Sequence, residues 1–180
     1  MVLFFATLQV AAQKRMKDGF YVTTNGDTIT CQIVTTPTLM GEINFSVLAK
    51  RLTVIENNEK KKFSPSDIQS FVVKDDQGTK HTFVSLRGDK SRFFNEVIKG
   101  KLSLYNLYSN DLYDGSTIIM PIMVKDDKIF YLNFINRRQI IGNLISDCPK
   151  LFKEWTETDK YSPKDKEAIV RAYNDCNIKE

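Results

Sequence analysis

The chain is poor in the residues that most often carry catalytic and metal chemistry. Its 180 residues include one histidine, His81, and three cysteines. A serine triad or a cysteine–histidine pair would have to use His81, which lies in a strand-like segment with no partner that the sequence identifies. A zinc site needs four clustered nitrogen or sulfur ligands, but the one histidine and the three cysteines are scattered along the chain. The sequence therefore predicts no catalytic residue and no metal site, and enzymatic activity is left open with a preference against it.

Long apolar runs and glycine-rich loops are also missing. No stretch reaches the roughly 18 to 20 apolar residues that a transmembrane helix needs. No glycine-rich phosphate loop precedes a predicted helix, so no cofactor is expected. The 26 basic residues exceed the 22 acidic ones by only four, and the surplus is dispersed along the chain. Nucleic acid is therefore not expected as a partner.

The first charged residue is Lys14. The thirteen residues before it, MVLFFATLQVAAQ, contain an apolar run and place Ala11 and Ala12 before Gln13, as a signal-peptidase site would. The basic segment that usually opens a signal peptide is missing, and a frayed terminal strand or helix is the alternative. We expect residues 1–13 to be a signal peptide or its remnant, and the chain to be exported to the periplasm, the cell surface or the medium.

Residues 14–135 have mainly the period of two that is typical of strands. Two β-rich stretches meet at Asn25-Gly26-Asp27 within Gly19–Val34, which predicts a hairpin. Two more hairpins are expected over 69–86 and 117–135, and the paired acids Asp75-Asp76 and Asp126-Asp127 are interpreted as their turns. Residues 41–48 alternate and predict a further strand. About eight antiparallel strands are expected in this β-rich body.

From Asn136 the period changes to that of helices. Three short helices are expected in 136–180, the second beginning at Pro149 and the third at Ser162-Pro163. This segment should pack on the β-rich body within a single domain, because the chain is too short to make two domains the natural expectation. The predicted fold class is α+β with a helical C-terminal segment.

The cysteines differ in their surroundings. Cys148 and Cys176 each lie on the apolar face of a predicted helix, so packing of the two helices would allow a disulfide in an exported chain. Two buried thiols that fill gaps in the core are the alternative. Cys31 lies in a predicted strand, where a packed free cysteine is favoured over a nucleophile or a metal ligand.

A local excess of positive charge is a candidate binding feature. It is a candidate anion-binding cluster that comprises Lys50, Arg51, Lys60, Lys61 and Lys62. The same residues are also typical of a solvated sheet edge that resists aggregation, and this interpretation is favoured.

Several short motifs occur in an order that resembles a group of exported proteins from Bacteroidetes-type bacteria with no assigned activity. The motifs are Gly19–Val22, Asn25–Ile29, Ser64–Ile68, Gly100–Tyr105, Asp147–Pro149 and Tyr173–Cys176. The resemblance implies export, a β-rich body, a helical tail and pairing of Cys148 with Cys176.

The function expected from these observations is that of an exported, non-enzymatic binding or envelope-associated module. Its ligand is not specified by the sequence, although a cell-envelope protein or glycan would fit. The alternative is a small envelope hydrolase that uses carboxylate and hydroxyl groups in place of histidine.

Overall fold

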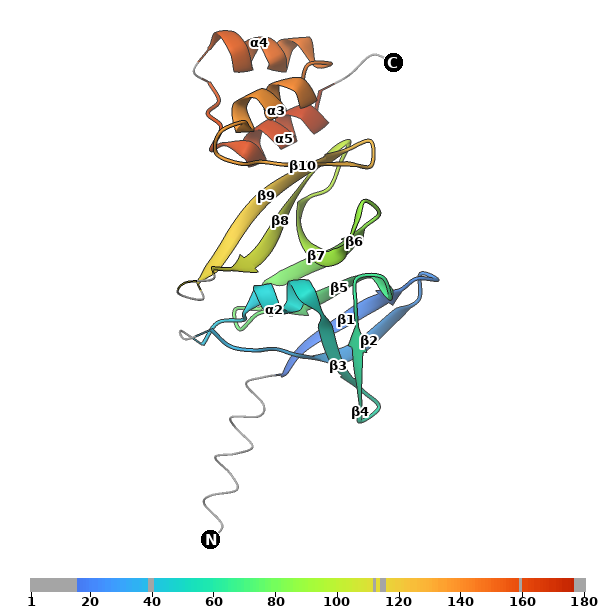
Figure 1. Ribbon diagram of the computed structural model, residues 1–180. Helices are drawn as coiled ribbons and strands as arrows, with labels where there is room; N and C mark the ends of the chain where they lie inside the picture. Colours follow the sequence, from blue (N-terminus) through green and yellow to red (C-terminus); the bar gives the residue numbers. More distant parts are fainter. Residues whose placement is uncertain (1–15, 39–40, 112, 114–115, 159, 177–180) are drawn as a thin grey trace. The chain divides into compact units, whose positions relative to one another are not determined.

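The computed structural model describes residues 16–38, 41–111, 113, 116–158 and 160–176 (Figure 1). The expected signal peptide at residues 1–13 lies outside these ranges. Within them, ten strands and four helices form an α+β protein whose strand pairs are mostly antiparallel. In chain order the elements are β1 Met16–Thr23, β2 Thr28–Val34, α2 Phe45–Lys50, β3 Leu52–Glu56, β4 Glu59–Phe63, β5 Ile68–Lys74, β6 Lys80–Leu86, β7 Asp89–Ile98, β8 Leu102–Asn110, β9 Thr117–Lys125, β10 Lys128–Tyr131, α3 Arg137–Leu144, α4 Pro149–Glu157 and α5 Lys166–Asn174.

The chain forms two compact units. Unit 1 comprises residues up to Asn95 together with Tyr108–Ile118, and unit 2 comprises Glu96–Leu107 and Ile119 onwards. Strands β7, β8 and β9 therefore have residues in both units. Among the described helices, none is long and apolar enough to cross a bilayer.

Unit 1 is a twisted antiparallel sheet in the order β7-β6-β5-β1-β2-β3-β4, with α2 beside it. The predicted hairpins β1–β2 and β5–β6 are confirmed, with Phe20 opposite Thr30 and Val72 opposite Thr82. The core lies on one face of the sheet, where Phe71 stacks on Phe83 with ring centroids 4.9 Å apart. Gly19 belongs to this packing, since a Cβ there would lie 2.3 Å from the Val72 carbonyl oxygen.

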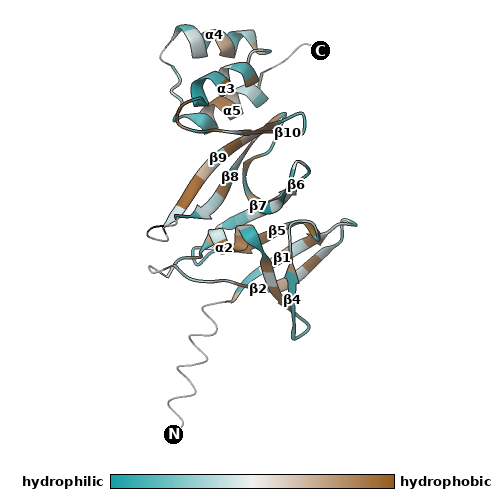
Figure 2. Cartoon of the chain, viewed as in Figure 1, coloured by the Kyte–Doolittle hydropathy of each residue, from teal (hydrophilic) through white to brown (hydrophobic). Residues whose placement is uncertain are grey.

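Unit 2 contains β10-β9-β8 and the three C-terminal helices. Figure 2 shows hydrophobic stretches along β8 and β9. The core includes Leu102, Leu104, Ile141, Trp155 and Tyr173, all nearly or fully buried. Helices α3, α4 and α5 confirm the predicted change of period. The third begins at Lys166, later than expected, because Ser162–Asp165 forms a turn in which Asp165 Oδ2 accepts a hydrogen bond from the Ser162 N–H.

Three sequence-based expectations about elements were wrong. Residues 41–48 do not form a strand, because Asn44 caps a helix there and its side chain accepts a hydrogen bond from the Ser46 N–H (3.2 Å). The count of about eight strands missed β4 and β7. Four charged residues in succession hide the period of β4, and the adjacent Phe93 and Phe94 conceal that of β7. The hairpin expected over 117–135 is shorter than predicted, because its second strand, β10, ends at Tyr131.

Candidate functional site

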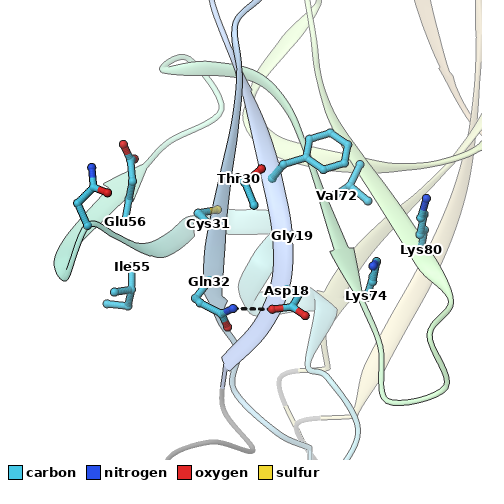
Figure 3. Close-up of a pocket in the computed structure, with 12 residues that line it drawn as sticks. Asp18, Gly19, Thr30, Cys31, Gln32, Ile55, Glu56, Val72, Lys74 and Lys80 are labelled. Carbon is cyan, nitrogen blue, oxygen red and sulfur yellow. Dashed lines mark hydrogen bonds between the residues drawn. The ribbon is translucent and has the colours of Figure 1, made fainter.

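A shallow groove of about 450 Å³ lies on the face of the unit 1 sheet opposite the core (Figure 3). Alternation along the strands directs side chains to this face, because residues directly opposite one another in a ladder share a face. Phe20 thus lies beside Thr30 and Val72, and Asp18 beside Gln32. The lining residues come from β1, β2, β3, β5 and β6 and from the turn after β3.

The groove carries charges of both signs. Lys74 and Lys80 are paired across β5 and β6, and Asp18 lies on the same face of the sheet, where it accepts a hydrogen bond from the side chain of Gln32 (Figure 3). Glu56 also lines the groove, from the end of β3. The groove can therefore accommodate a polar ligand that carries both kinds of charge, with Phe20 and Val72 as its apolar floor.

Glu56 is held by two donors. Its Oε2 accepts hydrogen bonds from the Tyr21 hydroxyl (2.8 Å) and from Lys61 Nζ (3.1 Å), and these lower the pKa of Glu56. Burial, together with the same bond to Glu56, raises the pKa of Tyr21 to about 12. A general acid needs a raised carboxyl pKa, so this carboxylate is suited to binding and not to proton donation.

Cys31 is a buried free cysteine, as the sequence favoured. Burial and the nearby Glu56 carboxylate raise the pKa of the Cys31 thiol to about 11. Since the thiolate is the nucleophile and the metal ligand, this environment opposes both roles.

His81 has an acidic partner that the sequence did not reveal. Its Nε2 lies 2.9 Å from Asp75 Oδ2, and its ring packs on Phe45 with centroids 4.6 Å apart. Asp75 also accepts hydrogen bonds from the N–H groups of Gln77 and Thr79, and bonding to His81 lowers its pKa. The pair organises the β5–β6 turn, in agreement with the turn interpretation of Asp75-Asp76. The contact between His81 and Asp75 could have been predicted from an antiparallel register in which Lys74 lies opposite Lys80.

Asp126 and Asp127 form the β9–β10 turn, with φ angles of 51° and 59°. Aspartate tolerates this left-handed conformation better than most residues. These acids therefore serve the hairpin, as the sequence indicated.

The five predicted anion-binding residues do not share one face. Lys50 ends α2 and Arg51 follows it, whereas Lys60, Lys61 and Lys62 belong to β4. Lys61 lies opposite Val54 on the core side and pairs with Glu56, while its two neighbours point the other way. Strand β4 is the last in the order of unit 1, and so these lysines line a sheet edge.

In unit 2, Cys148 and Cys176 form a disulfide with Cα atoms 6.4 Å apart. Cys148 precedes α4 and Cys176 follows α5, so the bond joins the two helices near their ends. The alternative of two buried thiols was wrong.

An exposed apolar pair, Phe134 and Ile135, is the feature that the sequence analysis missed. The two side chains are 90% and 94% exposed. They were expected to end a strand, but Asn133 Oδ1 accepts hydrogen bonds from the N–H groups of Ile135 (3.1 Å) and Asn136 (2.9 Å), and this turns the chain out of the sheet. Two asparagines flanking two apolar residues are the only local signal for this turn.

Comparison with known proteins adds no assignment, since no protein-family model, no curated protein and no solved structure matches the chain.

Proposed function

We propose that the chain is an exported binding module of the cell envelope. The carrying observation is the nearly complete exposure of Phe134 and Ile135 in a loop that hydrogen bonds hold in place. Each side chain would gain roughly 1.5 to 3 kcal/mol if it were fully removed from water. A fixed loop that presents two such residues is suited to contact with a partner.

The disulfide supports the compartment in this proposal. Disulfides persist in oxidising environments and are rare in the cytosol of mesophiles. The apolar segment 1–13 favours the same compartment, as do the ordered motifs that resemble those of exported Bacteroidetes-type proteins.

A hydrolase that uses carboxylates and hydroxyls is less well supported. The groove of unit 1 does bring acids and a hydroxyl together, but Asp18 is engaged by Gln32, and the pKa of Glu56 is lowered. Both features favour ligand binding over acid catalysis.

Cell fractionation tests the proposal. The full chain, produced in a Gram-negative host, should leave the cytoplasm, sediment with the envelope fraction and carry the Cys148–Cys176 bond, as determined by intact mass after alkylation. The variant Phe134→Ser, Ile135→Ser should be exported and oxidised equally well but should move to the soluble fraction. Tyr113→Ser is the matched control, because Tyr113 is equally exposed but belongs to unit 1.

Cytoplasmic retention with alkylated Cys148 and Cys176 would contradict export. Sedimentation with the envelope that is unaffected by the double substitution would contradict the assigned binding loop.

A further inference from the structure

Phe134 and Ile135 line a groove whose charged side chains are all positive. The groove measures about 350 Å³, and besides Phe134 and Ile135 it is lined by the cations Arg137, Arg138 and Lys164 together with Ser162 and Pro163. None of these described lining residues is acidic. Asp165 is the next acid along the chain, and its carboxylate is engaged by the Ser162 N–H (2.9 Å). The apolar pair is thus bordered by positive charge.

Arg137 and Arg138 are held in position by contacts with uncharged groups. Arg138 Nη2 donates to the Trp155 carbonyl (3.0 Å), and its guanidinium carbon lies 4.9 Å from the centre of the Trp155 ring. Arg137 Nη1 donates to the Pro163 carbonyl (3.5 Å), and its Nε has no hydrogen-bond partner although the atom is buried. Neither arginine forms an ion pair within the described part of the chain. Among the described residues, no acidic side chain therefore pairs with either positioned charge.

We infer that this loop docks on a lipid bilayer with anionic headgroups, with Phe134 and Ile135 entering the surface while Arg137, Arg138 and Lys164 contact headgroup phosphates. The inference rests on the proposed function and names the partner of the same loop. An apolar insertion and a cluster of cations are together the two signals that stable peripheral binding needs.

The size of the feature favours a lipid surface over a protein partner. A stable protein interface buries on the order of 1,000 Å² or more with a broad complementary surface. Two adjacent apolar side chains form a narrow projection, which suits shallow insertion among lipid headgroups. Guanidinium groups bind phosphate through two parallel hydrogen bonds, and arginine is therefore the appropriate cation here.

Vesicle sedimentation tests the inference directly. The full chain should bind vesicles of equal parts phosphatidylcholine and phosphatidylglycerol, bind pure phosphatidylcholine much more weakly, and dissociate as salt increases. Phe134→Ser, Ile135→Ser should lower partitioning at least about tenfold through lost apolar burial. Arg137→Gln and Arg138→Gln should each lower it about fivefold.

Two controls locate the contact. Tyr113→Ser removes an exposed aromatic residue from unit 1, and Lys60→Gln, Lys62→Gln removes two charges from the predicted anion-binding cluster; both should leave partitioning unchanged. All variants are identical outside the substituted positions, so differences among them report the loop.

A tryptophan placed at the loop provides a second readout. The emission of Phe134→Trp should shift to shorter wavelength on anionic vesicles, relative to the unchanged signal of Trp155 in the parent chain. Absence of that shift, equal binding to neutral vesicles, or binding unaffected by the double serine substitution would overturn the inference. Envelope sedimentation that depends on the loop, combined with no vesicle binding, would leave the proposed function standing and assign the loop to a protein or glycan.

Discussion

At the scale of single residues, Asn174 shows how a side chain can take the place of a strand. Its Oδ1 accepts a hydrogen bond from the Leu102 N–H and its Nδ2 donates to the Leu102 carbonyl, both at 2.9 Å. Gly100 leaves room for this contact, since a Cβ there would lie 2.3 Å from Asn174 Nδ2. The last turn of α5 is thereby attached to the beginning of β8 within unit 2.

Replacing this side chain should destabilise unit 2. Asn174→Ala leaves the Leu102 N–H and carbonyl without partners, and Leu102 is fully buried, so the free energy of unfolding should fall by about 3 kcal/mol. Urea unfolding followed by the emission of Trp155, the single tryptophan, measures the change. Asn143→Ala, at an exposed position of α3, is the matched control and should be neutral or slightly stabilising. Equal stability of the two variants would contradict the assigned role.

At the scale of elements, the sequence predicts best where local chemistry and structure agree. The hairpins at Asn25-Gly26 and Asp126-Asp127 have turn residues that tolerate positive φ, and the C-terminal helices have an apolar period of 3.6. The charged strand β4 has no such signal, and for α2 the alternation over 41–48 conceals the helix that Asn44 caps. Contacts between residues far apart in sequence, such as Asn174 with Leu102, cannot be inferred from spacing.

The candidate sites divide in the same way. The partnership of Cys148 with Cys176 could be predicted because each cysteine continues an apolar helical pattern in the sequence, although the structure places both residues just outside the helices. The exposure of Phe134 and Ile135 could not be predicted, since the local sequence does not indicate whether an apolar side chain is buried. The groove of unit 1 depends on five strands being adjacent, and was therefore also beyond the sequence.

The disulfide between α4 and α5 should contribute measurably to stability. It connects residues separated by 28 positions, and closing a loop of that length stabilises by about 3 to 4 kcal/mol in the chain-entropy estimate. Reductant should lower the urea midpoint of the Trp155 transition, because Trp155 lies in the core of unit 2. Cys148→Ala, Cys176→Ala should unfold at this lower midpoint with or without reductant. A midpoint that is the same in oxidised and reduced wild-type protein would contradict the prediction.

At the scale of the whole molecule, carboxylates with lowered pKa values occur in both units. Hydrogen bonds lower the pKa of Asp75 through His81 and that of Asp165 through Ser162. For Asp147, partial burial acts in the opposite direction, but hydrogen bonds from Lys125 and Tyr173 prevail and its pKa is lowered. Each of these groups binds protons less readily in the folded chain than in the unfolded chain.

The protein should therefore lose stability in acid. A carboxyl group with a lowered folded pKa contributes fully above its ordinary pKa of about 4, and this contribution disappears as the pH falls through the folded value. Urea midpoints measured from neutral pH downwards should decline below about pH 5. Asp75→Asn should reduce the dependence on pH, whereas Glu42→Gln, at an exposed carboxylate, should preserve it. A flat profile in the wild type would be inconsistent with this account.

The bond between Cys148 and Cys176 also determines the product of proteolytic cleavage between these residues. Because it closes a covalent ring around α4, α5 and the segment that joins them, a protease that cleaves between the helices cannot release either piece. The nicked chain would migrate as one band on a non-reducing gel and separate into two fragments only after reduction. Digestion patterns of this protein should therefore be compared under both conditions.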